Sequence, residues 1–215
     1  MGGILRMKQI CVFMLILGLI GCVKGTQQAR EEKEKAMDLK GKKVLMIIAS
    51  SNFRDEEYLV PQGIFKSQGI EVVTASSSLE ISRGVLGAKV KPDIIITQVK
   101  VADYDAICFI GGSGCVEYWE NKTAHNIARE AVAQNKVLAA ICSAPVTLAN
   151  AGVLKGKKAT VFLSDAGKLK AKGVNYTGSE VEIDGNNDAS IIVTGNGPQA
   201  AEKFAQAIIN LLNQK

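Results

Sequence analysis

The sequence predicts one α/β domain, built as a doubly wound, mostly parallel sheet with helices on both faces. Two observations support this fold class. Short, uninterrupted apolar runs recur along the chain, as in strands that are buried on both faces of a parallel sheet. Segments with helical periodicity separate these runs, and alternation of strand and helix is typical of α/β proteins. The length of 215 residues fits one domain with a short appendage.

The expected elements follow the chain in order from Lys43. Strands are expected at the apolar runs, which span residues 43–49, 69–74, 105–110 and 136–141. Helices are expected at the periodic segments, which span residues 55–67, 123–134, 143–151 and 198–212. The last helix has Pro198 in its first turn, where the fixed φ and missing N–H of proline are tolerated. In such folds a functional site lies beyond the carboxyl ends of the strands.

Composition argues against several function classes. The formal net charge is only +5, aromatic residues make up 5% of the chain, and no dense block of lysine or arginine occurs. This pattern disfavours nucleic-acid binding. The chain has five cysteines and one histidine, and the cysteine spacings match no common zinc pattern. We therefore expect neither a metal nor another cofactor.

The N-terminus has the features of an export signal. Arg6 and Lys8 precede an apolar run at residues 10–20, which is short for a membrane span but typical of a signal peptide. The run ends in Leu-Ile-Gly-Cys, which resembles a bacterial lipobox, so lipidation of Cys22 is expected. The alternatives are an ordinary secretory signal and an uncleaved anchor.

This reading of the N-terminus predicts how the chain is organised. Residues 1–21 are expected to be a signal peptide, residues 22–42 a charged tether, and residues 43–215 the folded domain. The mature protein would be anchored by lipid in the bacterial cell envelope, with its domain in the periplasm or outside the membrane.

Cys142 is the strongest candidate for a reactive group. It follows the expected strand at 136–141 and opens the next helix through Ser143, Ala144 and Pro145. A sharp strand-to-helix turn exposes its central side chain at the top of the sheet. A helix N-terminus also favours a thiolate, so the pKa of Cys142 is expected well below the free-thiol value of about 8.5. The alternative is an ordinary buried cysteine.

Two other loops fall at the same edge of the predicted sheet. The turn at Gly111 and Gly112 has no side chains to block its backbone N–H groups, and together with the Ser143 N–H these can bind a developing oxyanion. Glu57 lies at the start of the first helix, and a carboxyl group beside a thiol can exchange a proton with it. Each signal is weak alone, because glycine pairs are common in turns and acidic residues often complement a helix dipole.

In combination, these loops resemble the ThiJ/PfpI superfamily over residues 43–212, nearly the whole expected domain. The resemblance rests on the segments 57–61, 105–112, 139–145, 150–156 and 196–198. Members of this superfamily include cofactor-free glyoxalases, a protein deglycase and an intracellular cysteine peptidase.

The resemblance implies a flavodoxin-like three-layer sandwich with a nucleophile elbow, as in class I glutamine amidotransferases. It also implies Cys142 as the nucleophile, Glu57 as its acidic partner, and Gly112 and Ser143 as oxyanion donors. Because members of the superfamily often dimerise, it further implies a homo-oligomer, most simply a dimer.

The chain departs from the family pattern at its histidines. Peptidase members usually have a histidine directly after the nucleophile, where this chain has Ser143. Deglycase-like members often place one further downstream, where this chain has Phe162. The only histidine is His125, whose place near the edge of the apolar stripe of the helix at 123–134 indicates a surface or helix-start residue. The missing dyad weakens the peptidase interpretation.

Three interpretations of function follow. The first is a cysteine-dependent, cofactor-free enzyme that acts on reactive carbonyls as a glyoxalase or deglycase, with Cys142 as nucleophile and Glu57 as acid/base. The second is a non-enzymatic redox-sensing or chaperone-like stress protein. The third is a cysteine peptidase or amidohydrolase. The expected partners are a small reactive carbonyl or glycated substrate, the membrane through the lipid anchor, and a second copy of the chain.

Cys115 is a candidate for a second thiol near the site. An exported protein meets an oxidising compartment, where a neighbouring cysteine can trap an oxidised Cys142 as a disulfide. This requires the two Cα atoms to come within about 7 Å. The alternative is that Cys115 is a small apolar residue that fills space at the start of a helix.

Overall fold

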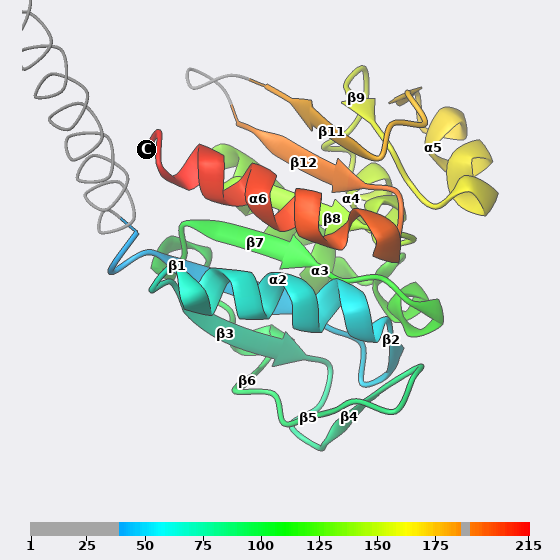
Figure 1. Cartoon of the computed structure of the whole chain (residues 1–215). Coiled ribbons are helices and arrows are strands. Elements are labelled where there is room, and N and C mark those ends of the chain that lie inside the picture. The colour runs from blue at the N-terminus through cyan, green and yellow to red at the C-terminus, as the bar shows by residue number, and fades with distance from the viewer. Residues whose placement is uncertain (1–38, 186–189) are drawn as a thin grey trace, which may run out of the picture. The chain divides into compact units, whose positions relative to one another are not determined.

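A seven-stranded sheet forms the centre of the structure, a computed structural model that describes residues 39–185 and 190–215 (Figure 1). Its strands lie in the order β11-β12-β8-β7-β1-β3-β6. Along the chain they are β1 (Lys43–Ile47), β3 (Glu71–Ser76), β6 (Ile94–Ile95), β7 (Ala106–Phe109), β8 (Val137–Ile141), β11 (Val181–Asp184) and β12 (Ile192–Gly195). All neighbouring pairs are parallel except β11 and β12. The prediction of a doubly wound, mostly parallel sheet is confirmed.

Alternate residues of each strand face opposite sides of the sheet, and both sides are buried. Leu45 pairs in register with Ile107, and both belong to the apolar core on one side. Met46 pairs with Cys108, and both belong to the core on the other side. Burial on both faces explains why these strands are uninterrupted apolar runs in the sequence.

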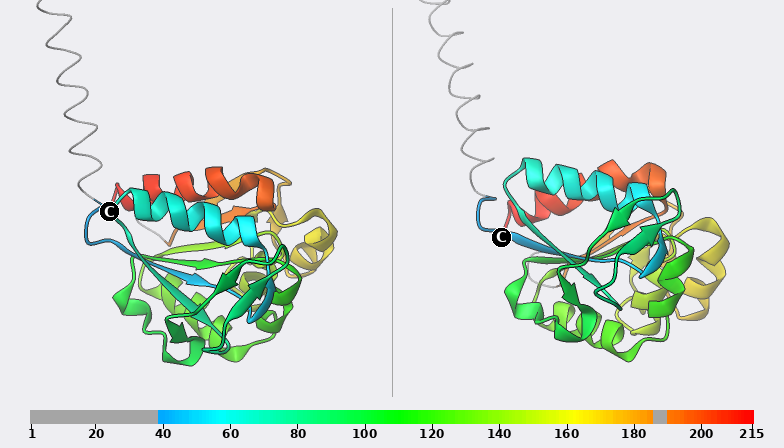
Figure 2. Two further views of the ribbon diagram at one scale, coloured as in Figure 1. Left: turned by 60° about the horizontal axis from the view of Figure 1, so that its bottom comes forward. Right: turned by 90° about the horizontal axis from the view of Figure 1, so that it is seen from below.

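Helices cover both faces of the sheet, which gives the three layers of a flavodoxin-like sandwich (Figure 2). On one face, α2 (Asp55–Ser67) and α6 (Ala201–Leu212) lie side by side. On the other face lie α3 (Lys122–Ala133) and α4 (Pro145–Asn150), and α5 (Ala166–Ala171) packs against α4. Each layer is held by apolar side chains, such as Phe204 of α6, whose burial stabilises the fold by about 1.5–3 kcal/mol.

Shorter elements connect these layers. A separate three-stranded sheet is formed by β2 (Ser51–Phe53), β4 (Ser82–Gly84) and β5 (Lys89–Val90), and β9 (Lys158–Ala159) pairs with β10 (Asn175–Tyr176). The 3-10 helices are η1 (Ile96–Gln98), η2 (Val101–Asp103), η3 (Ser113–Tyr118), η4 (Leu163–Asp165) and η5 (Pro198–Ala200).

Several elements differ from the expectation. The strands β11 and β12 were not expected, although they extend the central sheet beyond β8. The helix expected at 198–212 begins as η5 and becomes α-helical only from Ala201. The helix expected at 143–151 is shorter, because α4 begins at Pro145. This last difference matters for Cys142, which precedes α4.

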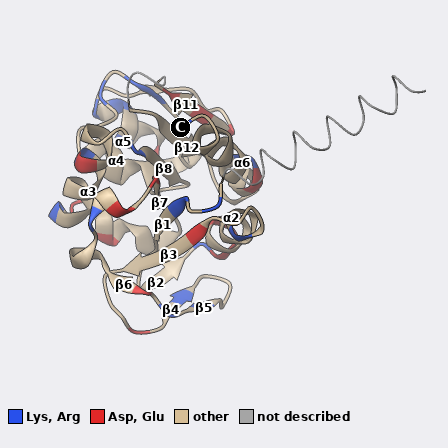
Figure 3. Cartoon of the chain, turned by 90° about the vertical axis from the view of Figure 1, so that its left-hand side faces the viewer, with Lys and Arg blue, Asp and Glu red and all other residues tan. Residues whose placement is uncertain are grey.

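The expected signal peptide, Cys22 and most of the expected tether lie outside the described residues. Leu39 falls within the range expected for the tether, yet it is buried in the core beside α6 residues, so the folded domain includes it. Between Leu39 and Lys215, excluding 186–189, no helix is long and apolar enough to cross a membrane. Basic and acidic positions are both spread around the domain (Figure 3).

Candidate active site

The loops that follow β7 and β8 meet the start of α2 at the carboxyl edge of the sheet. β8 ends at Ile141, and Cys142 follows it with a φ of 61°, a left-handed conformation that non-glycine residues rarely adopt. Its backbone is held on both sides. The Cys142 N–H donates to the Gly195 carbonyl oxygen at 2.9 Å, and the Phe162 N–H donates to the Cys142 carbonyl oxygen at 2.8 Å. Cys142 therefore occupies the expected sharp turn after the strand.

Glu57 lies directly beside Cys142 and is fully buried in the first turns of α2. Its Oε2 accepts a hydrogen bond from the Gly111 N–H at 3.1 Å. Its Oε1 has no hydrogen-bond partner among the described residues, and the neighbouring Cys142 thiol is a group that can donate to this carboxyl. The structure thus brings together the two residues that the sequence predicts to be catalytic.

Burial controls the protonation of this pair. It raises the pKa of Glu57 to about 8, and hydrogen bonds from Cys142 and the Gly111 N–H oppose the rise only in part. Burial and the negative charge of an ionised Glu57 together raise the pKa of Cys142 to about 12. The Gly112 N–H acts in the opposite direction by hydrogen-bonding to the sulfur, and the Ser143 Oγ lies 4.0 Å from the sulfur. At neutral pH the Glu57 carboxyl is therefore mainly protonated.

The expectation of a strongly lowered pKa for Cys142 is wrong for two physical reasons. First, α4 begins at Pro145 after an Ala144 cap, so Cys142 does not lie in the first turn of the helix. Second, Cys142 is only 7% exposed, and poor solvation disfavours the thiolate. Reactivity must therefore come from groups that remove the thiol proton and not from a helix dipole.

The two glycines after β7 have different roles. Gly111 was expected to help bind an oxyanion. Its N–H is already bonded to Glu57, so Gly111 positions the carboxyl group instead. The Gly112 N–H points to the sulfur of Cys142, and Gly112 and Ser143 both line the pocket beside it. Gly112 and Ser143 thus remain the candidates for oxyanion donors.

Close packing requires glycine in this turn. A Cβ atom on Gly111 would lie 2.6 Å from both Cys142 Cβ and Glu57 Oε2. Gly112 has a φ of 98°, and a Cβ atom on it would lie 2.4 Å from the backbone nitrogen of Arg54. A Cβ on Gly114 would lie 1.7 Å from the Ser51 carbonyl oxygen. The glycines therefore allow the loop after β7 to fit between the nucleophile, the acid and the chain around β2.

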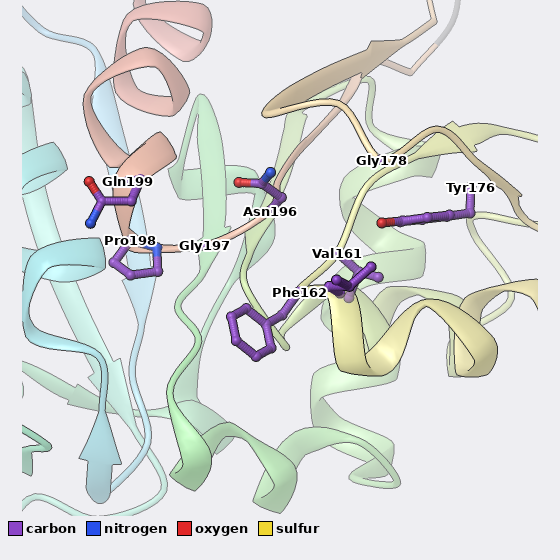
Figure 4. A pocket seen from close by; sticks show the side chains of 9 residues that line it. Val161, Phe162, Tyr176, Gly178, Asn196, Gly197, Pro198 and Gln199 are labelled. Atoms are coloured by element: carbon purple, nitrogen blue, oxygen red, sulfur yellow. The ribbon is translucent and has the colours of Figure 1, made fainter.

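A pocket of about 320 Å³ opens onto Cys142. It is lined by Arg54, Val85, Gly112, Ser113, Cys142, Ser143, Phe162, Ser164 and Pro198. A second hollow of about 450 Å³ shares Phe162 and Pro198 with it and continues toward Tyr176 and Asn196 (Figure 4). The ring of Phe162 stands between the two hollows. Phe162 thus lies at the site, where deglycase-like relatives often have a histidine, but it has no proton to transfer.

Asp165 is a polar residue of this site that was not expected from the sequence. It is 5% exposed, and its Oδ2 accepts a hydrogen bond from the Ser143 hydroxyl at 2.7 Å. Asp165 follows Phe162 closely in the sequence. An acidic residue near the position of Phe162 was therefore the signal that the sequence offered.

His125 lies in the first turn of α3, one of the two places expected for it, but it is buried against the loop after η3 and does not lie at the surface. Its Nε2 lies 2.8 Å from the Trp119 carbonyl oxygen, which also accepts a hydrogen bond from the Asn150 side chain. Its ring therefore fixes the backbone of this loop. The interpretation that His125 is not catalytic agrees with this contact.

Cys115 lies in η3 and is 1% exposed. Burial raises its pKa far above the ordinary range. Cys108, Cys115 and Cys142 are all free thiols. The packing role expected for Cys115 fits its burial, and its role as a resolving thiol stays a prediction.

Comparison with known proteins places these features in a family. The model of the DJ-1/PfpI family matches residues 42–211. The chain is 36% identical over 213 residues to an uncharacterized protein of Methanocaldococcus jannaschii, covering 97% of this chain and 98% of that protein. It is 32% identical over 142 residues to the deglycase PfpI of Pyrococcus furiosus, covering 66% and 86% of the two chains.

More distant relatives and solved structures agree. A glutathione-independent glyoxalase of Caenorhabditis elegans is 26% identical over 171 residues, covering 80% of this chain and 89% of that protein. The crystal structure of a ThiJ/PfpI domain protein from Brachyspira murdochii superimposes with a TM-score of 0.76 at 30% identity, covering 80% of this chain and 97% of that one. The cysteine elbow, the buried acid and the sandwich around them thus occur in a chain that belongs to the DJ-1/PfpI family.

Proposed function

We propose that this protein is a cysteine-dependent enzyme that needs no cofactor and acts on reactive carbonyl compounds, as a glyoxalase or deglycase. Cys142 is the nucleophile and Glu57 the acid/base. The observation that carries the proposal is the placement of Cys142 beside a fully buried Glu57, both next to Gly111, where burial raises the pKa of Glu57 to about 8. Acids and bases work most efficiently when their pKa lies near the working pH.

The proposed reaction begins with addition of the Cys142 sulfur to an aldehyde carbon. A carbon–sulfur bond forms, the carbonyl electron pair moves to oxygen, and the Gly112 and Ser143 N–H groups stabilise the resulting charge. With methylglyoxal as substrate, the ionised fraction of Glu57 then takes the proton from the first carbon and returns it to the second. The hydroxyl proton on the first carbon's oxygen moves to the oxygen of the second carbon, which gives a thioester. Water hydrolyses this thioester to a hydroxy acid and regenerates the thiol.

The site residues favour this reaction class over the two alternatives. Relatives carry the names deglycase, glyoxalase and putative cysteine protease. A peptidase would need an acid to protonate the leaving amine, and the histidine of this chain is held by Trp119 instead. A redox sensor would need an exposed thiol that ionises easily, whereas Cys142 is buried and its pKa is raised.

A substrate panel tests the proposal. The full chain, Cys142→Ala and Cys108→Ala are incubated with methylglyoxal, a glycated peptide and casein, and the products are quantified. Cys108 is the matched control, because it is a buried cysteine within β7. We expect wild type and Cys108→Ala to convert the carbonyl substrates and Cys142→Ala to be inactive. Cleavage of casein alone, or no conversion of any substrate, would refute the proposal.

A further inference from the structure

Ser143 is held in place by contacts to both its backbone and its side chain. Its carbonyl oxygen accepts a hydrogen bond from the Trp119 indole N–H at 3.1 Å. Its hydroxyl group donates to Asp165 Oδ2 at 2.7 Å. Because that hydrogen points to Asp165, the lone pairs of Ser143 Oγ remain for another donor. The sulfur of Cys142 lies 4.0 Å from this oxygen.

Asp165 is paired with a lysine although it is 5% exposed. Its second oxygen, Oδ1, accepts from Lys168 Nζ at 2.6 Å. The same ammonium group lies 5.0 Å from the centre of the Trp119 ring. Trp119 therefore holds Ser143 and Lys168 holds Asp165, and the two holding residues contact each other. A buried carboxylate that has both a cation and a hydrogen-bond donor can persist as an anion.

At neutral pH, Glu57 cannot by itself remove the proton from the Cys142 thiol, which is the first step of the reaction. Its carboxyl group is mainly protonated there, so it can donate to the sulfur but cannot take the thiol proton. Of the other charged groups near Cys142, Arg54 is paired with Glu56 through two hydrogen bonds and cannot accept a proton. Asp165 is the remaining carboxylate with a hydrogen-bonded path to the sulfur.

We propose that Ser143 and Asp165 form a proton relay that activates Cys142 independently of Glu57. The thiol proton passes to Ser143 Oγ, while the Ser143 hydroxyl proton passes to Asp165 Oδ2. When the thiolate has added to the carbonyl carbon, the same two protons move back, and Ser143 protonates the new oxyanion. The net step adds S–H across the C=O bond and restores Asp165 as a carboxylate. This inference rests on the proposed function and deepens it.

In this relay Ser143 is a catalytic residue, because it contacts the reacting sulfur. Asp165 acts through Ser143 and is a positioning residue. Asp165 could act on Cys142 as a nearby negative charge or as a proton acceptor. These two roles predict opposite effects of Asp165→Asn on the thiolate fraction of Cys142. Removal of a nearby negative charge should increase the thiolate fraction, whereas removal of the acceptor should decrease it.

The test measures iodoacetamide alkylation of Cys142 in the full chain between about pH 6 and about pH 9. The variants are Ser143→Ala, Ser143→Thr, Asp165→Asn and the double variant Ser143→Ala/Asp165→Asn. Asp184→Asn is the matched control, because Asp184 likewise binds a lysine. Its second partner is a backbone N–H instead of a hydroxyl group, and it lies on β11. Circular dichroism checks the fold of each variant.

We expect Ser143→Ala and Asp165→Asn each to slow alkylation near pH 7 by at least about tenfold. The double variant should be no slower than either single variant, because both residues serve one path. Ser143→Thr keeps a hydroxyl group and should retain most of the rate, and Asp184→Asn should retain all of it.

Alkylation of Asp165→Asn at or above the wild-type rate would overturn the relay. If Asp165→Asn does not fold, equal rates for Ser143→Ala and Ser143→Thr would overturn it. Alkylation needs no substrate, so a wild-type protein that fails to convert methylglyoxal but shows this pattern would refute only the proposed function.

Discussion

Glu57 and Cys142 are close enough that the protonation of one changes the other. An ionised Glu57 disfavours the thiolate, whereas a protonated Glu57 can donate a hydrogen bond to it. As the pH rises through about 8, Glu57 ionises and becomes able to take the thiol proton. The pair then holds one proton between its two members, and part of this population is a thiolate beside a neutral acid.

This linkage predicts the pH dependence of Cys142 alkylation. The wild-type rate should rise with pH and show an inflection near the Glu57 pKa of about 8. Glu57→Gln can still accept from Gly111 and donate to the sulfur, but it cannot titrate, so the inflection near 8 should disappear. Glu56→Gln, a change of the half-buried neighbour that pairs with Arg54, is the control and should keep an inflection. A Glu57→Gln profile that matches wild type would reject Glu57 as the titrating group.

Gly111 provides a second test at the scale of one residue. Gly111→Ala would place a methyl group 2.6 Å from both catalytic side chains, so the site must shift. We expect turnover to fall by at least about tenfold and the free energy of unfolding to fall by about 1–3 kcal/mol. Gly63→Ala is the matched control, because a Cβ there meets nothing within 4 Å on the helix α2. That control should be as stable as wild type or about 0.5–1 kcal/mol more stable. Full turnover by Gly111→Ala would contradict the geometry of the site.

The sequence identifies part of this site because part of it is local. Cys142 follows a recognisable strand, and a glycine turn and an acidic helix start are visible in the same way. The contact between Ser143 and Asp165 is not visible, because it depends on how η4 packs against the elbow. The raised pKa of Cys142 was also missed, since it depends on the start of α4 and on burial, neither of which sequence spacing gives.

The helix α6 covers the sheet beside α2 and supports the strands that carry the elbow. Its buried side chains include Phe204, which is fully enclosed and lies near Gly195 of β12. Gly195 in turn accepts the hydrogen bond from the Cys142 N–H. Packing of this helix is therefore connected to the backbone of the nucleophile through one neighbouring strand.

Phe204→Ala should destabilise the protein by about 3–5 kcal/mol, because it removes a buried ring from a core that cannot fully collapse. Urea unfolding of the full chain measures this change. Gln206→Ala, at an exposed position of the same helix, should remain within about 0.5 kcal/mol of wild type. A loss below about 1 kcal/mol for Phe204→Ala would show that α6 is not packed as described.

At the scale of elements, the sequence predicts best what is buried on both faces. The runs at β1, β7 and β8 are apolar throughout and were predicted as strands. β11 is an edge strand with half-exposed residues, so its pattern is weak. The short strands β4 and β5 are held by long-range contacts, since the Leu86 and Ala88 N–H groups both donate to Asp55 at 2.7 Å. Such contacts leave no periodic signal in the sequence.

In the whole molecule, the residues of the proposed site come from separate parts of the chain. α2 supplies Glu57, the loop after β7 supplies Gly112, the elbow supplies Cys142 and Ser143, and η4 supplies Asp165. Parallel strands bring these segments to one edge of the sheet, as is usual for sites in this fold class. The doubly wound topology could be predicted from strand and helix alternation, and with it the edge where the site lies.

The N-terminal segment leads to a prediction for the intact protein. We propose that the mature chain begins at lipid-modified Cys22, which would place the domain at a membrane surface. Intact mass measurement of the protein from the envelope fraction should show a diacylglyceryl group. Cys22→Ala should remove it, whereas Cys11→Ala, within the expected signal peptide, should not. An unmodified protein as the only species would contradict lipidation.

We propose that Cys142 forms the covalent intermediate with a reactive carbonyl. The most direct measurement is an acid quench during turnover of methylglyoxal by the full chain, followed by peptide mapping with mass spectrometry. We expect a hydroxyacyl thioester on Cys142. The adduct should be absent from Cys142→Ala and present in Cys108→Ala. Formation of the hydroxy acid with no adduct on Cys142, or with the adduct on Cys108 or Cys115, would contradict it.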